Sequence, residues 1–117
     1  MKILLRHSFD DKPARLIAGA VRKGVISYPI KVWYHYGERH RDNDKPAVVN
    51  RYFKYWYQKG KLHRYNDKPA IERTYANEWY WYGKRHRENN QPAIMVKKLF
   101  QGERPDKYYL NDVEYFP

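Results

Sequence analysis

Aromatic and polar positions follow one another along this chain with a long fixed period, and no segment has convincing helical spacing. Trp33, Trp56 and Trp79 each open an aromatic run, which is followed by a glycine, a His-Arg pair and a Pro-Ala pair. The tryptophan, glycine, histidine and proline each recur after 23 residues. Such a period is typical of proteins built from repeated supersecondary units. The chain is therefore predicted to be a tandem repeat.

The repeat divides the 117 residues into segments of one expected domain. Two inserts break the period, since His7 lies 33 residues before His40 and Tyr108 lies 29 residues after Trp79. In chain order the segments are a partial repeat (1–14), an insert (15–29), full repeats (about 30–52, 53–75 and 76–98), an insert (97–107) and a partial repeat (108–117).

Within each unit the local chemistry predicts strands joined by tight turns. Aromatic runs favour strands, and a glycine or Asn-Asp pair supplies the positive φ of a two-residue hairpin turn. The expected turns are Tyr36-Gly37, Lys59-Gly60, Tyr82-Gly83 and Asn111-Asp112, with second turns near Asn50–Lys54 and Ala76-Asn77. Proline cannot donate to a strand ladder, so Pro46, Pro69 and Pro92 mark bends or edges.

These elements predict an all-β fold, an antiparallel meander of tandem β-hairpins in a single-layer twisted sheet of roughly eight to ten strands. Leu16–Val21 is the one segment that could form a helix, but the Arg22-Lys23-Gly24 sequence after it favours another hairpin turn. An open meander has two exposed edges, which allows edge-to-edge association of copies into a homo-oligomer.

The unit Trp-Tyr-x-x-Gly-x-x-His-Arg-x-x-x-x-Pro-Ala resembles MORN repeats. It is more similar to a MORN-like variant that is frequent in proteins of bacteriophages and large DNA viruses. The resemblance covers about residues 30–115, although Arg41, Arg64 and Arg87 replace later glycines of the standard repeat. It implies a single-layer sheet of hairpins and a viral accessory protein, without implying one biochemical activity.

The charge indicates what kind of partner the protein binds. The net charge is +11, from 24 Lys and Arg against 13 Asp and Glu. Residues 1–60 carry 13 basic and 5 acidic side chains (net +8), and residues 61–117 carry 11 and 8 (net +3). Nucleic acid, an anionic membrane surface and an acidic protein all fit this excess. We expect the binding face to lie toward the N-terminal half.

The repeated side chains are expected to hold the fold. Equivalent histidines would lie ~10 Å apart on successive hairpins, too far to share one zinc ion whose ligands lie at ~2.1 Å. Each is expected to hydrogen-bond within its bend, with the Asp four residues later as the candidate partner, as in His40/Asp44. The tryptophans are expected to form the core rather than a base-stacking platform. The structural positions are Trp33, Trp56, Trp79, Gly37, Gly60, Gly83, His40, His63, His86, Pro46, Pro69 and Pro92.

The candidate binding residues are tyrosines on the face opposite the tryptophans and basic residues outside the repeat. The regular arginines Arg41, Arg64 and Arg87 could either track phosphates or serve the repeat, and the sequence leaves both open. The nonrepeating cations are more informative, because the fold does not demand them. The candidates are Tyr34, Tyr36, Tyr57, Tyr80, Tyr82, Arg15, Arg22, Lys23, Lys31, Arg51, Lys54 and Lys59.

Enzymatic constellations are nearly absent from the sequence. There are two serines, one threonine, no cysteine and no Gly-rich phosphate loop, so we expect neither catalysis nor a metal or cofactor. The first hypothesis is an accessory protein that binds and inhibits a host protein with an acidic or nucleic-acid-binding surface. The second is an electrostatic nucleic-acid-binding module, and the third is binding to anionic lipid. With neither an expected leader nor a membrane span, the chain is predicted to be cytoplasmic in the host cell.

Overall fold

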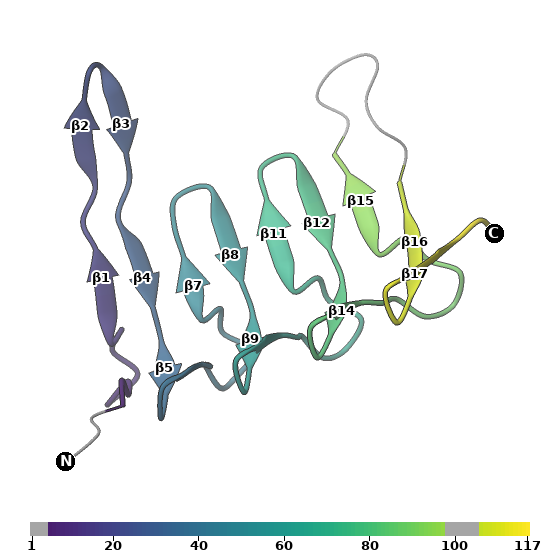
Figure 1. Ribbon diagram of the computed structural model, residues 1–117, viewed down its shortest axis with the longest axis horizontal. Helices are drawn as coiled ribbons and strands as arrows, with labels where there is room; N and C mark the ends of the chain where they lie inside the picture. Colours follow the sequence, from purple (N-terminus) through teal and green to yellow (C-terminus); the bar gives the residue numbers. More distant parts are fainter. Residues whose placement is uncertain (1–4, 98–105) are drawn as a thin grey trace.

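The computed structural model describes residues 5–97 and 106–117. In this part of the chain there are seventeen short β-strands, all paired antiparallel, and no helix. Figure 1 shows the arrangement: a row of upright strands, with small hairpins along its lower margin and one long hairpin at the N-terminal end. The predicted all-β meander of hairpins is confirmed. The principal extents of the molecule are 52 × 37 × 25 Å.

Seven strands form the large sheet, and each lies beside its neighbour in chain order once the small hairpins are set aside. Every connection within this sheet therefore returns the chain to the next position in the row. The strands are β1 (Arg15–Ile17), β4 (Ile30–Val32), β7 (Val48–Val49), β8 (Phe53–Tyr55), β11 (Ile71–Arg73), β12 (Ala76–Glu78) and β15 (Ile94–Val96).

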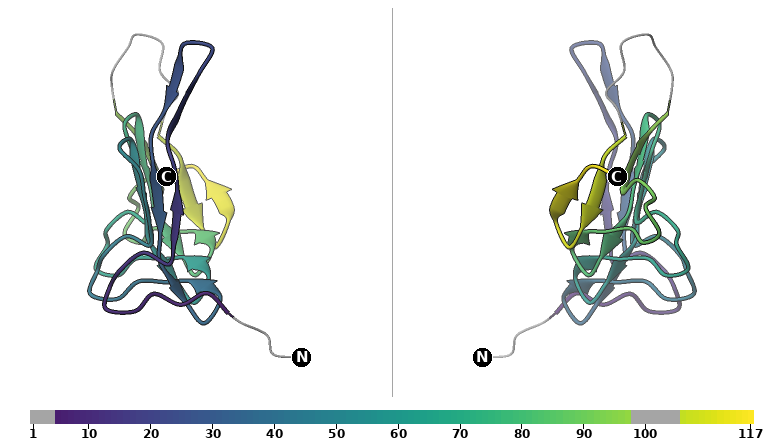
Figure 2. Two further views of the ribbon diagram at one scale, coloured as in Figure 1. Left: turned by 90° about the vertical axis from the view of Figure 1, so that its left-hand side faces the viewer. Right: turned by 90° about the vertical axis from the view of Figure 1, so that its right-hand side faces the viewer.

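Ten further strands form five separate two-stranded hairpins. They are β2 (Ala20–Arg22) with β3 (Val25–Ser27), β5 (Tyr34–His35) with β6 (Glu38–Arg39), β9 (Tyr57–Gln58) with β10 (Lys61–Leu62), β13 (Tyr80–Trp81) with β14 (Lys84–Arg85), and β16 (Tyr108–Leu110) with β17 (Val113–Tyr115). Seen edge-on, the small hairpins leave the sheet on one side and loops leave it on the other (Figure 2).

The strand count exceeds the predicted eight to ten because the expected long strands are interrupted, at each tryptophan on the way into a small hairpin and by an Asp-rich loop on the way out, as between β6 and β7. Trp33 separates β4 from β5, and Trp56 and Trp79 do the same in the next two repeats. The N–H of each tryptophan donates to an alanine carbonyl within its own repeat, at 2.7–2.8 Å, instead of continuing the small hairpin. The chain therefore bends between the sheet and the hairpin.

Each of the four predicted two-residue hairpin turns is present, and both of its central residues have positive φ. Tyr36 and Gly37 have φ of 45° and 84°, and the equivalent pairs up to Asn111-Asp112 behave alike. This is the geometry of the tight turns that match strand twist. Lys23 and Gly24 adopt it too, so the segment after Leu16 forms the predicted hairpin turn. One expected turn is displaced: Ala76-Asn77 lies inside β12, and the chain turns at residues 74–75.

The core is a column of tryptophans with small partners. Trp33, Trp56 and Trp79 are each only 6–7% exposed, and the alanine that accepts each backbone hydrogen bond is fully buried. A methyl group at this position leaves room for the indole, since a larger side chain would have to displace it. Repetition of this packing gives a thin molecule whose core runs along its length.

The two edges of the large sheet differ. At the C-terminal edge, Ile94 and Lys107 exchange backbone hydrogen bonds of 2.9 and 3.0 Å, so the segment around residue 107 covers β15. At the N-terminal edge, β1 pairs with β4 on one side, and no strand of residues 5–97 or 106–117 pairs with its other side. Its outer backbone groups are therefore open to a further strand.

Candidate interaction surface

The repeated arginines are held inside the scaffold. The guanidinium carbon of Arg64 lies 3.7 Å from the ring centre of Trp56, and its Nη1 donates to the carbonyl of Pro69 at 3.2 Å. Its Nε donates to Asp44 of the preceding repeat at 2.9 Å. Arg41 and Arg87 make the same three contacts. These arginines are therefore occupied by the fold and are poorly placed to track phosphates.

Each tryptophan also crosses from one repeat to the next. The indole N–H of Trp56 donates to the carbonyl of Asp44 at 3.0 Å, and Trp33 and Trp79 reach Asp11 and Asp67 at the same distance. The aspartate of one repeat thus receives both the arginine and the tryptophan of the next repeat. A stacked, hydrogen-bonded arginine contributes about 0.5–2 kcal/mol, so this motif stabilises the junction between successive repeats.

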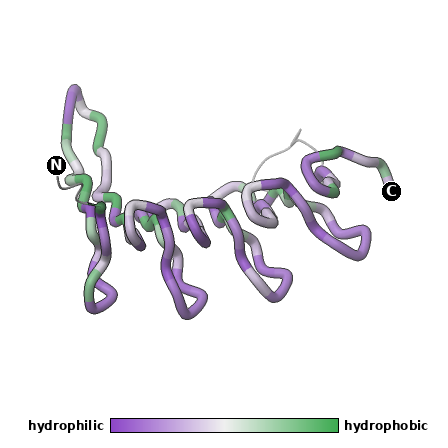
Figure 3. The backbone as a smooth tube through the Cα atoms, turned by 60° about the horizontal axis from the view of Figure 1, so that its bottom comes forward, coloured by the Kyte–Doolittle hydropathy of each residue, from purple (hydrophilic) through white to green (hydrophobic). Residues whose placement is uncertain are grey.

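The Asp-rich loops owe their composition to backbone conformation as well as charge. Asn43 and Asp44 have φ of 63° and 55°, and the equivalent pairs in the other loops are also left-handed. Asn and Asp tolerate this region best among residues with a Cβ. Figure 3 shows these loops as a row of hydrophilic projections.

The ion pairs of these loops lower the pKa of two carboxylates. Hydrogen bonding from Arg64 lowers the pKa of Asp44, and Lys68 adds to the effect. The pKa of Asp11 is lowered in the same way by Arg41 and Lys45. Each of these two aspartates therefore joins its negative charge to two cations of the following repeat.

The candidate partner of the histidines, the Asp four residues later, is wrong. His40 and His86 do hydrogen-bond within their bends as predicted, but their Nε2 atoms contact Asp42 at 2.8 Å and Glu88 at 2.7 Å. The other ring nitrogen, Nδ1 of His40, accepts the backbone N–H of Lys59 in the next repeat, at 3.0 Å. His7, His63 and His86 accept N–H groups from Tyr36, Tyr82 and Asn111 at 3.1–3.2 Å. Sequence spacing could not reveal this bond, because it joins residues 19 to 29 positions apart.

His63 is the most enclosed of these histidines. Its side chain is 1% exposed, and its ring stacks on Tyr82 with the centres 3.9 Å apart. Burial lowers the pKa of its imidazole, because the charged form would lose solvation. Within the described residues its Nε2 has no hydrogen-bond partner. The histidine therefore acts as a neutral acceptor between two repeats.

The predicted tyrosine face is divided by the fold. Tyr34, Tyr57 and Tyr80 are half-buried in the angle between the sheet and the hairpins, whereas Tyr36 and Tyr82 sit in exposed turns. An arginine from the preceding unit covers two of the half-buried rings, with Arg6 over Tyr34 and Arg39 over Tyr57, both at 5.6 Å. The five tyrosines therefore do not form one wet surface.

The predicted basic residues are also distributed over several surfaces. Strand register puts Lys31 and Lys54 on the face of the sheet opposite Arg15. Lys59 lies in a hairpin turn, and Arg51 lies 4.8 Å from the ring centre of Tyr28. Arg22 and Lys23 lie at the tip of the β2–β3 hairpin. The structure thus brings Arg22 and Lys23 together at the hairpin tip, and it puts Arg15 near Tyr34 and Tyr57.

The β2–β3 hairpin presents a mixed apolar and basic surface. Val21 and Val25 are each 69% exposed and Ile26 is 59% exposed, and Leu16 in β1 is exposed as well. The hairpin rises beyond the large sheet in Figure 1, and in Figure 3 its tip is hydrophilic while the segments below it are hydrophobic. Residues 12–37 contain five Lys or Arg and no Asp or Glu. Exposed apolar patches with such a rim mark interaction sites.

A groove lies at the base of this hairpin, on the face of the sheet that the small hairpins overhang. Its volume is about 240 Å³. Arg15, Val32, Val48 and Tyr55 stand side by side across adjacent strands. The lining residues are Arg15, Ile17, Ile30, Val32, Arg39, Val48, Phe53, Tyr55 and Tyr57.

The sequence identified two of these lining residues as candidates, Arg15 and Tyr57. Arg39, which also lines the groove, is not among the residues that the sequence predicted. One pattern in the sequence could have found this region: the acid-free stretch of residues 12–37 coincides with the insert and the strands beside it. The aliphatic lining could not be found, since cross-strand register alone puts Ile17 beside Ile30.

Comparisons with family models, curated proteins and solved structures find no match. The resemblance to MORN-like repeats therefore remains a prediction from the sequence. Among residues 5–97 and 106–117 there is no group of three or more His, Asp or Glu side chains that could hold a metal ion. The same part of the chain has no helix with the length and hydropathy needed to cross a membrane.

Proposed function

We propose that this chain is a non-enzymatic accessory protein that binds a host protein and modulates or inhibits it. The partner's contact surface is either acidic or one that normally binds nucleic acid. The resemblance of the repeat to those of bacteriophage and large DNA virus proteins supports the accessory role. The surface of the N-terminal third supports the choice of a protein partner.

The observation that carries this proposal is the β2–β3 hairpin. Three apolar side chains of this hairpin contribute little to the stability of the fold, because Val21, Val25 and Ile26 are mostly exposed. A partner that covered them would remove their apolar area from water, which favours binding. The nearby charges are all positive along residues 12–37. Complementary charge speeds association and selects partners. Val21 pairs with Ile26 on one face of the hairpin, whereas Val25 pairs with Arg22 on the other. Such exposed apolar side chains beside a basic tip suit an acidic protein surface with apolar residues at its centre.

Binding to nucleic acid is the second candidate, and one cluster favours it. The rings of Tyr28 and Tyr52 lie 5.3 Å apart, and Arg51 lies over both of them at 4.8 and 5.9 Å. Aromatic rings beside arginine are suited to stack bases. Against this reading, the regular arginines are held by aspartates, so a continuous cationic track along the repeats is not supported.

Affinity capture with immobilised protein tests the proposal. Lysate from the cells that express the protein is treated with nuclease and applied at about 200 mM salt, which weakens nonspecific phosphate contacts. The test variant carries Val21→Ser, Val25→Ser and Ile26→Ser. The matched control is Val113→Ser, since Val113 is 67% exposed in a different hairpin.

We expect one protein to be retained by the wild type and by Val113→Ser, and lost from the triple variant. That protein, once purified, should form a complex of fixed stoichiometry with the wild type. Titrations with single- and double-stranded DNA and RNA at about 50 and 200 mM salt are the counter-test. Tight nucleic-acid binding that survives the higher salt, without a protein complex, would refute the proposal in favour of the second candidate.

A further inference from the structure

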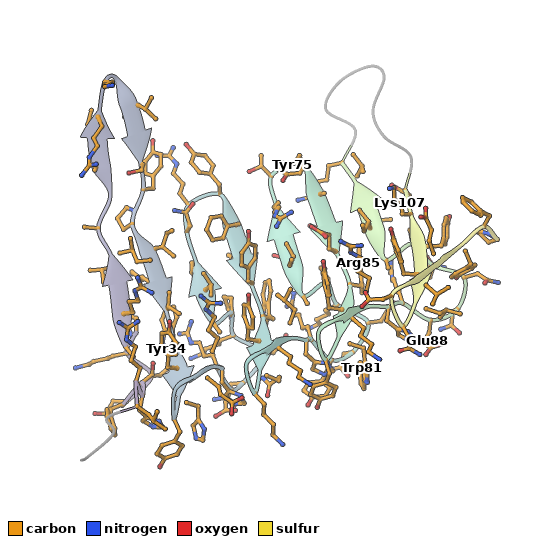
Figure 4. All side chains as sticks on the ribbon, viewed as in Figure 1. Tyr34, Tyr75, Trp81, Arg85, Glu88 and Lys107 are labelled. Carbon is orange, nitrogen blue, oxygen red and sulfur yellow. The ribbon has the colours of Figure 1, made fainter. Side chains whose placement is uncertain are left out.

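Three arginines from different parts of the chain gather around Tyr34, which lies at the lower end of the large sheet (Figure 4). The guanidinium carbon of Arg6 is 5.6 Å from the centre of the Tyr34 ring. Arg39 pairs with Tyr34 across the β5–β6 hairpin. Arg15 pairs with Val32, two residues before Tyr34, and lines the groove together with Arg39.

These arginines differ from the regular ones in lacking acidic partners. Arg41 and Arg64 each lie 2.9 Å from an aspartate oxygen. Within residues 5–97 and 106–117, no ion pair includes Arg6, Arg15 or Arg39. All three are exposed, so their charges are available to a ligand.

The three cations affect the pKa of the Tyr34 phenol. Burial acts to raise the pKa of this phenol, but the neighbouring guanidinium groups of Arg15, Arg6 and Arg39 outweigh it and hold the pKa below its ordinary value. A negative charge placed here would be stabilised in the same way. Arginine presents paired N–H donors that match the two oxygens of a carboxylate.

The groove continues from the arginines onto an apolar floor. Val32 and Val48 are buried in it, Ile30 is partly buried, and Tyr55 and Phe53 stack at its far end with ring centres 4.6 Å apart. A ligand that fills it must therefore carry negative charge at one end and an apolar group at the other.

We propose that this groove binds an acidic segment of the partner protein, with a carboxylate held among Arg6, Arg15 and Arg39 and an adjoining apolar side chain over Val32, Val48 and Tyr57. This inference rests on the proposed function, because it specifies where and how that partner is recognised. The groove and the β2–β3 hairpin flank β1, so one acidic and apolar surface could contact both.

The alternative occupants fit less well. A nucleic-acid strand presents a row of phosphates and needs cations along its path, whereas here the cations are clustered and lead onto aliphatic Ile17 and Ile30. A second copy of this chain would bring another net charge of +11 to an already cationic edge. Repulsion between like charges disfavours that association.

A peptide titration followed by NMR tests the site with the full chain. The probe is an acetylated and amidated peptide, Gly-Glu-Glu-Phe-Leu-Gly, and its control has Gln in place of both Glu. The test variant carries Arg15→Gln and Arg39→Gln, and Arg51→Gln is the matched control outside the groove. Thermal unfolding verifies that each variant folds, which we expect because none of these arginines has an ion-pair partner within the described residues.

We expect the Glu peptide to shift the signals of the groove at about 150 mM salt. The wild type should bind the Gln peptide about tenfold more weakly than the Glu peptide, since a charge-assisted contact is lost. The double variant should bind the Glu peptide about tenfold more weakly than the wild type does, for the same reason. Arg51→Gln should change it less than twofold. No shift with the Glu peptide, or equal binding of both peptides, would overturn the inference. The inference would also be overturned if an oligothymidylate of equal charge bound more tightly than the Glu peptide and if the double variant no longer bound that oligonucleotide.

The captured partner separates failure of this inference from failure of the proposed function. If the hairpin triple variant loses the complex while Arg15→Gln/Arg39→Gln keeps it, the groove is not the contact site but the protein still binds a protein partner. Loss of the complex with both variants supports the inference. Absence of any protein complex refutes both.

Discussion

The repeats from Trp33 to Ile94 and the hairpin that carries β2 and β3 differ in how they use the same residue types. In the repeats, arginines stack on tryptophans and pair with aspartates, and the rings of these tryptophans are buried. In the hairpin, valine and isoleucine are exposed, and Arg22 and Lys23 stand at the tip without ion pairs in the described structure.

This contrast separates side chains that serve the fold from side chains free to bind. A guanidinium that already contacts a ring, a carbonyl and a carboxylate has few donors left for a ligand. An exposed valine on a projecting hairpin has no such commitment. Mutations in the repeats should therefore change stability, and mutations in the hairpin should change binding.

The largest expected effect is in the tryptophan column. Trp56→Ala should lower the free energy of unfolding by about 3–5 kcal/mol, because it leaves a cavity in the core and removes the indole N–H that donates to the carbonyl of Asp44. Denaturant unfolding monitored by circular dichroism measures it. Trp81→Ala is the control, since Trp81 is 47% exposed, and it should cost much less. Equal losses would mean that the column is not the core.

A smaller loss is expected at the junction between repeats. Asp44→Asn keeps the shape and tolerates the positive φ of 55° but removes the charge that Arg64 and Lys68 contact. We expect a loss of about 1 kcal/mol at neutral pH, because the carboxylate is 42% exposed and screened. Asp42→Asn, in the same loop, should cost less.

The same substitution has a pH signature. The pKa of Asp44 is lowered in the folded chain, so its contribution is complete above the unfolded value of about 3.9 and is lost as the pH falls through the folded value. The stability difference between wild type and Asp44→Asn should therefore narrow in acid. A difference that stayed constant at low pH would exclude the ion pairs as its cause.

The next effect concerns His63 and is measured as the pH dependence of the free energy of unfolding. The pKa of His63 is lowered by burial, so below about pH 6.5 the unfolded chain takes up a proton that the folded chain resists. Stability should fall with falling pH, and it should fall less steeply in His63→Asn, whose side-chain oxygen can still accept the N–H of Tyr82. His35→Asn, which changes an exposed histidine, is the control. Thermal unfolding between pH 7.5 and 5.5 measures the slopes.

The smallest change in stability is expected for the hairpin. Val21→Ser, Val25→Ser and Ile26→Ser together should alter the free energy of unfolding by less than about 0.5 kcal/mol per site, since the side chains are mostly exposed. The same variant should lose the partner. A large destabilisation without loss of binding would reverse the comparison between the two regions.

The strand-and-turn pattern was accessible from the sequence because it depends on neighbours in the chain. Tyr36-Gly37 and Asn111-Asp112 adopt the positive φ that their residue types favour. The break at each tryptophan was missed, since strand propensity cannot show that the N–H of Trp33 bonds to Ala47 beside the large sheet while its carbonyl accepts from His40 in the small hairpin. The pairing of His40 with Asp44 was wrong for a related reason: spacing within one repeat is blind to the Lys59 backbone in the next.

The sequence by itself determined the all-β repeat architecture and the excess of positive charge, because period, turn chemistry and composition are properties of the chain alone. Only the tertiary structure decided which cations are occupied and which are free. Arg39 and Arg41 are two residues apart, yet one lines an open groove and the other is held by Asp11. The difference arises from contacts between residues distant in sequence, which form when one repeat packs against the next.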